Sequence, residues 1–486
     1  MPDRISFGNI ELSVRGKKTG QASPENDAPF RILVLGDFTG RASRGIVQSL
    51  AGRRCIKVDV DTLDAALSRM KPELTVTTDD GTSWAFSFAA LDDFHPDYIF
   101  RRLPLFQKLR ETRDALQNPA TAQRATAEVA SWAGTPMSPV KKEEDTFARL
   151  LGGASAEGTA RASAAAGGIH DLIRQIVAPY VVPTPNPNVA AMSAAVDAAI
   201  GAQMRDFLHQ PAFQALERAW RGLDFLVRNI ETDETLTICV LDVSKAELAG
   251  DLRGVDDLAR SGFFKIVVEE TVQSPGGVPW GVIIGDYSFG SAEDDTDLLA
   301  RIGKVAGAGG APFLGGADAE FVPAASTDAI VANETWGALR RLPQAESIGL
   351  AAPRFLLRLP YGKGGDPIDS FPFDELPDPT THDSFLWGNP TFVCACLLGE
   401  SFRQNEWRMT PGDVTELGGL PAHTFELEGE TKITPCAERW LTDGQAEKLL
   451  GVGIMPLLSI RGRDAVRLLR FQSIADPSVA LAGHWR

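Results

Sequence analysis

The stretch 204–242 constrains the fold of this chain more than any other part of the sequence. From Pro211 onward, apolar residues recur at steps of three and four, which predicts an amphipathic helix with one buried face. The period changes to two over 235–240, which predicts a strand directly after that helix. Ser244 and Glu247 then have the spacing of a capping box, so a further helix begins there. This stretch is a packing unit of a fold that mixes helices and strands, and its pattern contains no catalytic chemistry.

Three arginines of this helix, Arg218, Arg221 and Arg228, lie outside its apolar stripe, so we expect them to face water or a partner. Farther along, Arg354 and Arg358 stand four residues apart in an apolar run. If that run is helical, both guanidinium groups share one face and can pair with acids on a neighbour. These five arginines are our candidates for charged contacts at an interface.

Several other segments predict strands. The continuous apolar run 32–35 is typical of a strand that is buried on both faces, and so is 282–284. Residues 55–62 alternate in polarity, and 74–78 with 84–88 have the pattern of a hairpin. With helices between these strands, we expect an α/β fold of mixed sheets flanked by helices. A chain of 486 residues is too long for one core, so we expect two or three domains.

Composition excludes several functional classes. There are 48 basic and 64 acidic residues, so the net charge of −16 argues against broad binding to nucleic acid or to anionic membranes. The sequence contains no apolar run of about 18 residues that could span a membrane, and its first residues lack the pattern of a secretory signal. The odd number of cysteines suits buried thiols in a reducing compartment, so we expect a cytoplasmic protein. The five are Cys55, Cys239, Cys394, Cys396 and Cys436.

Two glycine-containing patterns resemble nucleotide-binding loops only superficially. A phosphate loop needs Lys followed by Ser or Thr after its second glycine, whereas Gly40 is followed by Arg41 and Ala42. The glycine-dense run 303–316 follows a helix, whereas a dinucleotide fingerprint follows a strand. We interpret the first as a strand and a tight turn, and the second as a close approach of a helix to a strand. We therefore expect no cofactor.

The acidic clusters have simpler explanations than metal binding or catalysis. The group within 92–97 lies at a turn and a helix start, where carboxylates meet the helix dipole favourably. Its members are Asp92, Asp93, His95 and Asp97. Residues 382–384 place His, Asp and Ser side by side, but catalytic triads converge from separate elements. The acids at 286–297, which begin with Asp286 after a buried strand, give the best argument for an α/β enzyme. We predict no catalytic residue and no metal ligand, and we keep an enzyme as an alternative.

Ordered blocks across most of the chain carry a family resemblance. FQALERAWRGLDFLV and VLDVSKAELAGDL are followed by WGVIIGDYSFG, DLLARIGKVAGAGGAPFLGG, APRFLLRLPYG, FLWGNPTF and VTELGGLPAH. In this order they resemble the large subunit of the bacterial type VI secretion contractile sheath, over roughly 170–480. PFRILVLGDFTGR and LDDFHPDYI are similar to the small subunit of the same sheath, over about 28–120. The resemblance divides the chain into a small-subunit-like domain (1–120), a helical and flexible linker (121–169) and a large-subunit-like domain (170–486).

In most systems of this family the two subunits are separate chains that form a tight heterodimer, and here one chain contains both. Fusion makes their meeting intramolecular and raises the effective concentration to the millimolar range. The resemblance implies a structural protein that assembles in stacked rings around an inner tube and contracts by changing its packing. Its implied partners are other copies and sheath subunits, the inner tube protein, the baseplate and a disassembling AAA+ ATPase. A non-polymerising adaptor that binds sheath or baseplate proteins is the alternative from another class.

Three terminal and linker features bear on assembly. Residues 5–14 alternate in polarity and predict a short strand with no neighbouring strand in the sequence, so we expect it to pair with another chain. Its apolar residues are Ile5, Phe7, Ile10, Leu12 and Val14. An amphipathic pattern over Phe147, Leu150 and Leu151 resembles the short helix that the ATPase grips in large subunits. Large subunits of the family usually continue past the match. We therefore expect a chain that ends at Arg486 to lack the C-terminal half of the strand exchange that links neighbours.

Overall fold

We describe the protein from a computed structural model. The residues that the structure describes are 28–77, 83–132, 173–174, 176–182, 188–322, 333–363, 365–378, 384–427 and 429–485. The expected strand at 5–14 and the expected ATPase-binding helix around Leu150 lie outside these ranges.

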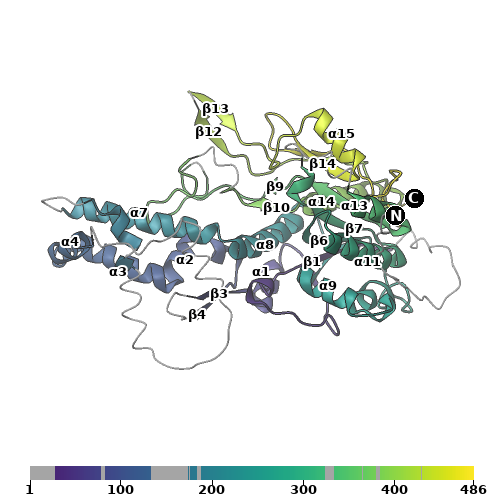
Figure 1. Ribbon diagram of the computed structural model, residues 1–486, viewed down its shortest axis with the longest axis horizontal. Helices are drawn as coiled ribbons and strands as arrows, with labels where there is room; N and C mark the ends of the chain where they lie inside the picture. Colours follow the sequence, from purple (N-terminus) through teal and green to yellow (C-terminus); the bar gives the residue numbers. More distant parts are fainter. Residues whose placement is uncertain are drawn as a thin grey trace, which may run out of the picture.

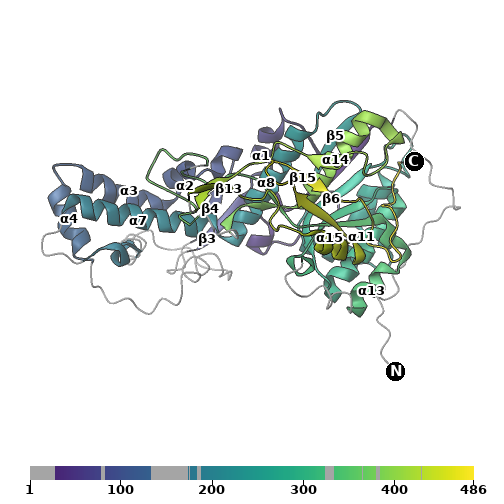
Figure 2. The same cartoon turned by 90° about the horizontal axis from the view of Figure 1, so that it is seen from above.

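The molecule is elongated, with a helical arm at one end and a sheet at the other (Figure 1). The arm contains α3 (Pro104–Gln117), α4 (Ala122–Ala130) and α7 (Val189–Leu208), and α8 (Pro211–Asn229) leads from the arm to the sheet. The view from above shows the same division (Figure 2). Helix α7 begins after its N-cap residue, Asn188. Helix α8 begins at Pro211, and proline suits this position because backbone N–H groups in the first turn have no partner within the helix. The predicted amphipathic helix is therefore confirmed.

Nine strands of the described residues form the main sheet. Their order across the sheet is β11 (Glu416–Leu417), β15 (Val466–Leu468), β14 (Ile454–Ser459), β8 (Ile348–Ala352), β7 (Phe313–Ala317), β6 (Val282–Phe289), β1 (Phe30–Gly36), β5 (Leu236–Asp242) and β2 (Ile56–Val58). From β14 to β5, each strand is parallel to its neighbour. The outer pairs are antiparallel: β15 with β14, β11 with β15, and β2 with β5. This is a mixed sheet, and the expected α/β fold is confirmed.

The remaining elements surround this sheet. The other helices are α1 (Leu63–Met70), α2 (Pro96–Arg102), α9 (Lys245–Arg253), α10 (Gly262–Phe264), α11 (Glu293–Gly309), α13 (Glu334–Arg340), α14 (Pro390–Asn405) and α15 (Asp443–Gly451). Three small antiparallel pairs are β3 (Glu73–Thr77) with β4 (Ser83–Ser87), β9 (Phe355–Leu356) with β10 (Trp387–Gly388), and β12 (Thr424–Leu427) with β13 (Glu430–Ile433). Short helical turns are η1 (Ala42–Arg44), η2 (Leu91–Phe94), η3 (Ala178–Tyr180), η4 (Leu258–Arg260), η5 (Lys265–Glu269), η6 (Ala319–Phe321), η7 (Pro343–Ser347) and η9 (Glu406–Arg408).

Helices cover both faces of the sheet, so successive residues of β1 enter two different apolar clusters. Ile32 and Val34 pack into the cluster that contains α8 and α14, whereas Leu33 and Leu35 pack into the cluster that contains α9 and α11. All four side chains are fully buried, as the continuous apolar run predicts. The result is a three-layer arrangement with the sheet in the middle.

Three local expectations are wrong. The run with Arg354 and Arg358 is not a helix: it contains the short strand β9, and Tyr361 beyond it bridges to Asp366. Asp286 lies inside β6 rather than after it, because the strand continues to Phe289. The glycine-dense run does not follow a helix, because its residues 303–309 belong to α11. The expected close approach is present, since a Cβ on Gly303 would lie 2.6 Å from Ile348 Cδ1 of β8.

Candidate functional site: the joint between the two segments

The small-subunit-like and large-subunit-like parts of the chain meet inside the main sheet. Strand β1 belongs to the first part, and it lies between β5 and β6 of the second part. Val34 stands opposite Val240 on one side and Ile284 on the other, both in parallel register. Because β1 is a central strand, both of its edges are hydrogen-bonded within the chain. This shared sheet joins the two parts in one body.

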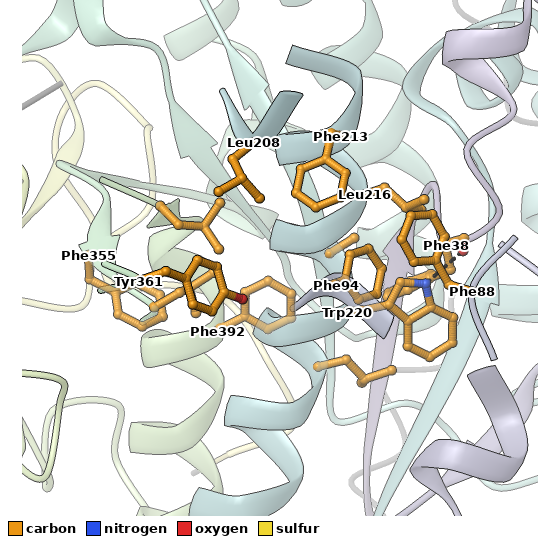
Figure 3. Packing of buried hydrophobic residues seen from close by; sticks show 14 of the residues in the cluster. Phe38, Phe88, Phe94, Leu208, Phe213, Leu216, Trp220, Phe355, Tyr361 and Phe392 are labelled. Carbon is orange, nitrogen blue, oxygen red and sulfur yellow. Dashed lines mark hydrogen bonds between the residues drawn. The ribbon is translucent and has the colours of Figure 1, made fainter. Parts of the chain in front are cut away.

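Aromatic side chains from both parts form the core next to this joint (Figure 3). Trp220 of α8 donates its indole N–H to the backbone oxygen of Phe38, at 2.8 Å, in the loop that follows β1. Phe88 and Phe94 stack on each other with ring centroids 4.2 Å apart, and Phe213 of α8 lies against both rings. These rings are buried, and such contacts add to the stabilisation from burial alone. Helix α8 therefore fastens the second part to the loops of the first.

Charged groups close the joint at the carboxyl end of β5. Arg53 forms a two-pronged ion pair with Glu247, at 2.6 Å and 3.0 Å, and Arg41 pairs with Asp242 at 2.5 Å. Burial by itself would raise the pKa of Glu247, but the Arg53 guanidinium and the backbone N–H groups of Ser244 and Gln48 lower it to about 2. Such a carboxylate stays ionised when buried because its partners satisfy it. The predicted capping box is confirmed, and Glu247 has a second role across the joint.

A second buried ion network lies farther along α8. Arg358 donates to Glu217 and to Glu375, at 2.8 Å in each case. Burial would raise the pKa of Glu375, whereas the Arg358 charge lowers it to about 2. Arg221 donates to Glu217 and to the Tyr361 hydroxyl, at 2.7 Å each. The network ties α8 to the segment around β9, so these charges hold the core together.

The helical arm also binds the two parts to each other. Arg113 of α3 forms an ion pair with Asp197 of α7 at 2.8 Å and donates to the Ser370 carbonyl at 2.9 Å. The Asp97 carboxylate accepts from the backbone N–H groups of Asp369 and Ser370, at 3.2 Å and 3.0 Å. The joint therefore extends from the sheet to the arm.

A pocket with a volume of about 450 Å³ lies where β1, β5 and β6 end, which is where open parallel sheets bind ligands. Its charged side chains already have partners: Lys245 lies 2.6 Å from Asp295, and Arg218 lies 3.5 Å from Asp286. Burial raises the pKa of Asp286. The pocket is lined by these partnered charged side chains and by the apolar side of α8. This is not the arrangement of a catalytic site, in which a base lies beside a nucleophile.

The other acids are also engaged in structural contacts. Asp297 lies within α11 and pairs with Arg253 and Arg301, each at 3.0 Å. In the 92–97 group, Asp93 accepts from the N–H groups at the start of η2, and His95 caps α2, in agreement with the capping interpretation. Within the described ranges, no three His, Cys, Asp or Glu side chains gather as metal ligands would.

The structure gives each candidate interface arginine a carboxylate within the chain. Arg221 and Arg358 belong to the buried network, so the expectation that Arg221 faces water or a partner is wrong. Arg354 pairs with Glu438 at 2.6 Å, and Arg218 faces Asp286. Arg228 pairs with Asp224 on the helix surface and remains mostly exposed, so its interface role stays a prediction. Their partners are far away in sequence, except for those of Arg221 and Arg228, which lie four residues earlier on the same helix face.

Comparison with known proteins agrees with this architecture. Residues 190–475 match the family model VipB (EvpB/VC_A0108, tail sheath N-terminal domain), and residues 9–130 match the model for the type VI secretion system protein VipA (VC_A0107 or Hcp2). None of the helices in the described ranges is both long and apolar enough to cross a membrane.

Two curated relatives come from Pseudomonas aeruginosa. The type VI secretion system sheath protein TssC1 is 34% identical over 309 residues, which are 60% of this chain and 62% of the relative. The sheath protein TssB1 is 33% identical over 96 residues, which are 18% of this chain and 55% of the relative. The chain thus spans somewhat less than two thirds of each curated relative that it matches. Because the first family model covers more than half of the sequence, the chain belongs to the VipB tail sheath family, and a VipA-like segment precedes the VipB-like part in the same polypeptide.

Proposed function

We propose that this protein is a structural component of a type VI secretion contractile sheath that contains both sheath-subunit types in one chain. The observation that carries the proposal is the position of β1: a strand of the VipA-like segment completes the sheet of the VipB-like segment. A building block of this kind does mechanical work through a change of packing between subunits, and this requires no bond chemistry.

The proposal includes partners and a location. By family resemblance, we propose that copies of this chain assemble with one another and with other sheath subunits around an inner tube, on a baseplate, in the cytoplasm. We also propose that a disassembling ATPase recognises the segment that contains Phe147, Leu150 and Leu151. The five cysteines are free thiols, which supports a reducing compartment.

The boundaries of the parts also belong to the proposal. We propose a VipA-like part at 1–120, a linker at 121–169 and a VipB-like part at 170–486. The linker begins with helix α4, which belongs to the arm, and Val129 of this helix is part of the buried core. Because the two parts share one sheet, these boundaries divide the sequence according to its family resemblance and do not separate two folded bodies.

The direct test is to express the whole chain alone, sediment it and examine the pellet by negative-stain microscopy. Tubes or rings support a sheath component that assembles by itself. A single compact species at high concentration, which pellets only when other secretion components are added, would favour the adaptor role instead.

The strand predicted at 5–14 gives a second test. We propose that it serves contacts between subunits, because an isolated strand needs an outside partner for its backbone groups. Deletion of residues 1–20 should leave the melting temperature of the monomer unchanged and reduce self-association. A fall of many degrees in the monomer would show that the strand belongs to the core.

A further inference from the structure

An exposed groove with both polar and apolar lining residues lies beside the β12–β13 hairpin, which projects from the body in Figure 1. The Trp440 side chain is 50% exposed and that of Ile433 is 47% exposed. These two residues, with Pro435 and Ile460, line a pocket with a volume of about 390 Å³. A half-exposed tryptophan beside other apolar side chains is typical of a surface that binds another protein.

The rim of this groove is basic. Two arginines, Arg461 and Arg463, line it, and none of the described residues that line it is acidic. Arg463 lies 3.5 Å from Glu416, whereas Arg461 has no ion-pair partner in the parts of the chain that the structure describes. In a chain with a net charge of −16, a basic groove with exposed apolar side chains favours an acidic partner surface that also offers an apolar side chain.

The opposite end of the main sheet presents a surface of that kind. Among the described strands, β2 is the last at that end, and its one described partner is β5. Just after it, Val60 is 54% exposed, and two exposed acidic residues, Asp61 and Asp64, follow it in the sequence. Neither carboxylate has an ion-pair partner among the described residues. We name this surface the Val60 patch, and the basic groove around Trp440 the Trp440 groove.

We propose that the Trp440 groove of one copy receives the Val60 patch of a second copy. Val60 would contact Trp440 and Ile433, while Asp61 and Asp64 would face Arg461 and Arg463. The two surfaces lie near opposite ends of the sheet order, so the contact is heterologous, and a pair of joined copies keeps one free surface of each kind. Repetition of such a contact gives an open helical or closed ring assembly. The inference rests on the proposed sheath function and adds to it the pair of surfaces that join.

Charge reversal with rescue tests this pairing. Sedimentation of the full-length chain over a range of concentrations would give the concentration at which half of the protein assembles. We expect R461D and D61R to raise that concentration about tenfold each, because each places like charges opposite one another. The double variant R461D/D61R should return it to within about threefold of the wild type, since it restores opposite charges. W440A should weaken assembly about tenfold or more by removing the apolar anchor.

A matched control separates this contact from net charge. R124D changes an exposed arginine on α4 of the arm, far from both surfaces, and should assemble like the wild type. The charge variants R461D, D61R and R124D should keep the wild-type melting temperature, because the changed side chains are exposed. If the wild type assembles and R461D, D61R and W440A assemble equally well, the inference is overturned while the sheath function stands. Two weak single variants without rescue in the double variant would also overturn it. A wild type that stays monomeric at every concentration would contradict both.

Discussion

Trp220 donates its indole N–H to the backbone oxygen of Phe38 at 2.8 Å, and the two rings meet edge to face with centroids 5.3 Å apart. Trp220 lies in the VipB-like part of the chain and Phe38 in the VipA-like part, yet both belong to one buried cluster. The contact holds the loop after β1 against α8.

Replacement of Trp220 by Phe should therefore destabilise the protein. The variant keeps an aromatic ring but leaves the buried Phe38 carbonyl without its donor, which costs about 1–3 kcal/mol. Urea unfolding followed by circular dichroism would measure the loss. W440F, at an exposed tryptophan, should change the free energy of unfolding by less than about 0.5 kcal/mol. Equal effects at both positions would contradict the role assigned to the Trp220 hydrogen bond.

Removal of Arg358 should cost more than removal of any surface arginine. R358M leaves the buried Glu217 and Glu375 carboxylates without the guanidinium that they share, and the loss of one partner of a buried ion pair costs about 3–5 kcal/mol. The matched control R228M removes an exposed arginine that pairs with Asp224 one helical turn away, and should cost about 0.5 kcal/mol or less. Comparable losses in the two variants would refute the buried network.

Acid should weaken the joint through Glu247. Its folded-state pKa is about 2, below the ordinary value of 4.5, so its contribution is full above pH 4.5 and is lost as the pH falls through 2. We expect E247Q to be much less stable than the wild type at pH 7 and the difference to shrink below pH 4.5. Urea midpoints measured between pH 7 and pH 2.5 would test this, with the exposed Glu234→Gln variant as control. A difference that stays constant over this range would show that the Glu247 charge does not stabilise the joint.

Gly222 permits the close contact between α8 and α14. A Cβ at this position would lie 2.3 Å from Phe392 Cε2, so G222A should destabilise the protein by about 1–3 kcal/mol through overpacking. The second change F392L should recover part of that loss by making room. G250A, in an open position on α9, should instead stabilise the protein by about 0.5–1 kcal/mol, because alanine favours a helix. A destabilising G250A would show that a general cost of alanine, and not the Phe392 contact, explains G222A.

The sequence predicted what depends on local pattern. The apolar run at 32–35 predicted a strand buried on both faces, and Ser244 with Glu247 predicted a helix start, because strand burial and capping follow from residues close in sequence. The family resemblance supplied the order of the parts. Neither source could predict that β1 lies between β5 and β6, because strand order depends on contacts between residues about 200 positions apart.

The roles of charged residues were the hardest to predict. Arg221 lies outside the apolar stripe, and this indicated a surface position. In the structure its guanidinium donates hydrogen bonds to Glu217 and to the Tyr361 hydroxyl in the interior. Arg358 was assigned to an interface because a helix was assumed, whereas an extended segment turns it toward Glu217. The sequence near a buried charge does not reveal its burial, because the charge is stabilised by an ion-pair or hydrogen-bond partner far away in the sequence.

The measurement that tests the central claim most directly is a cut between the two parts. A protease site introduced within 155–168 would separate the VipA-like segment from the VipB-like part without touching any described residue of the joint. We predict that the two fragments co-elute at micromolar concentration under native conditions and separate only in denaturant, because β1 is hydrogen-bonded on both edges inside the sheet. Fragments that separate cleanly without denaturant would contradict a shared sheet, and with it the proposal that this chain joins both sheath subunits in one building block.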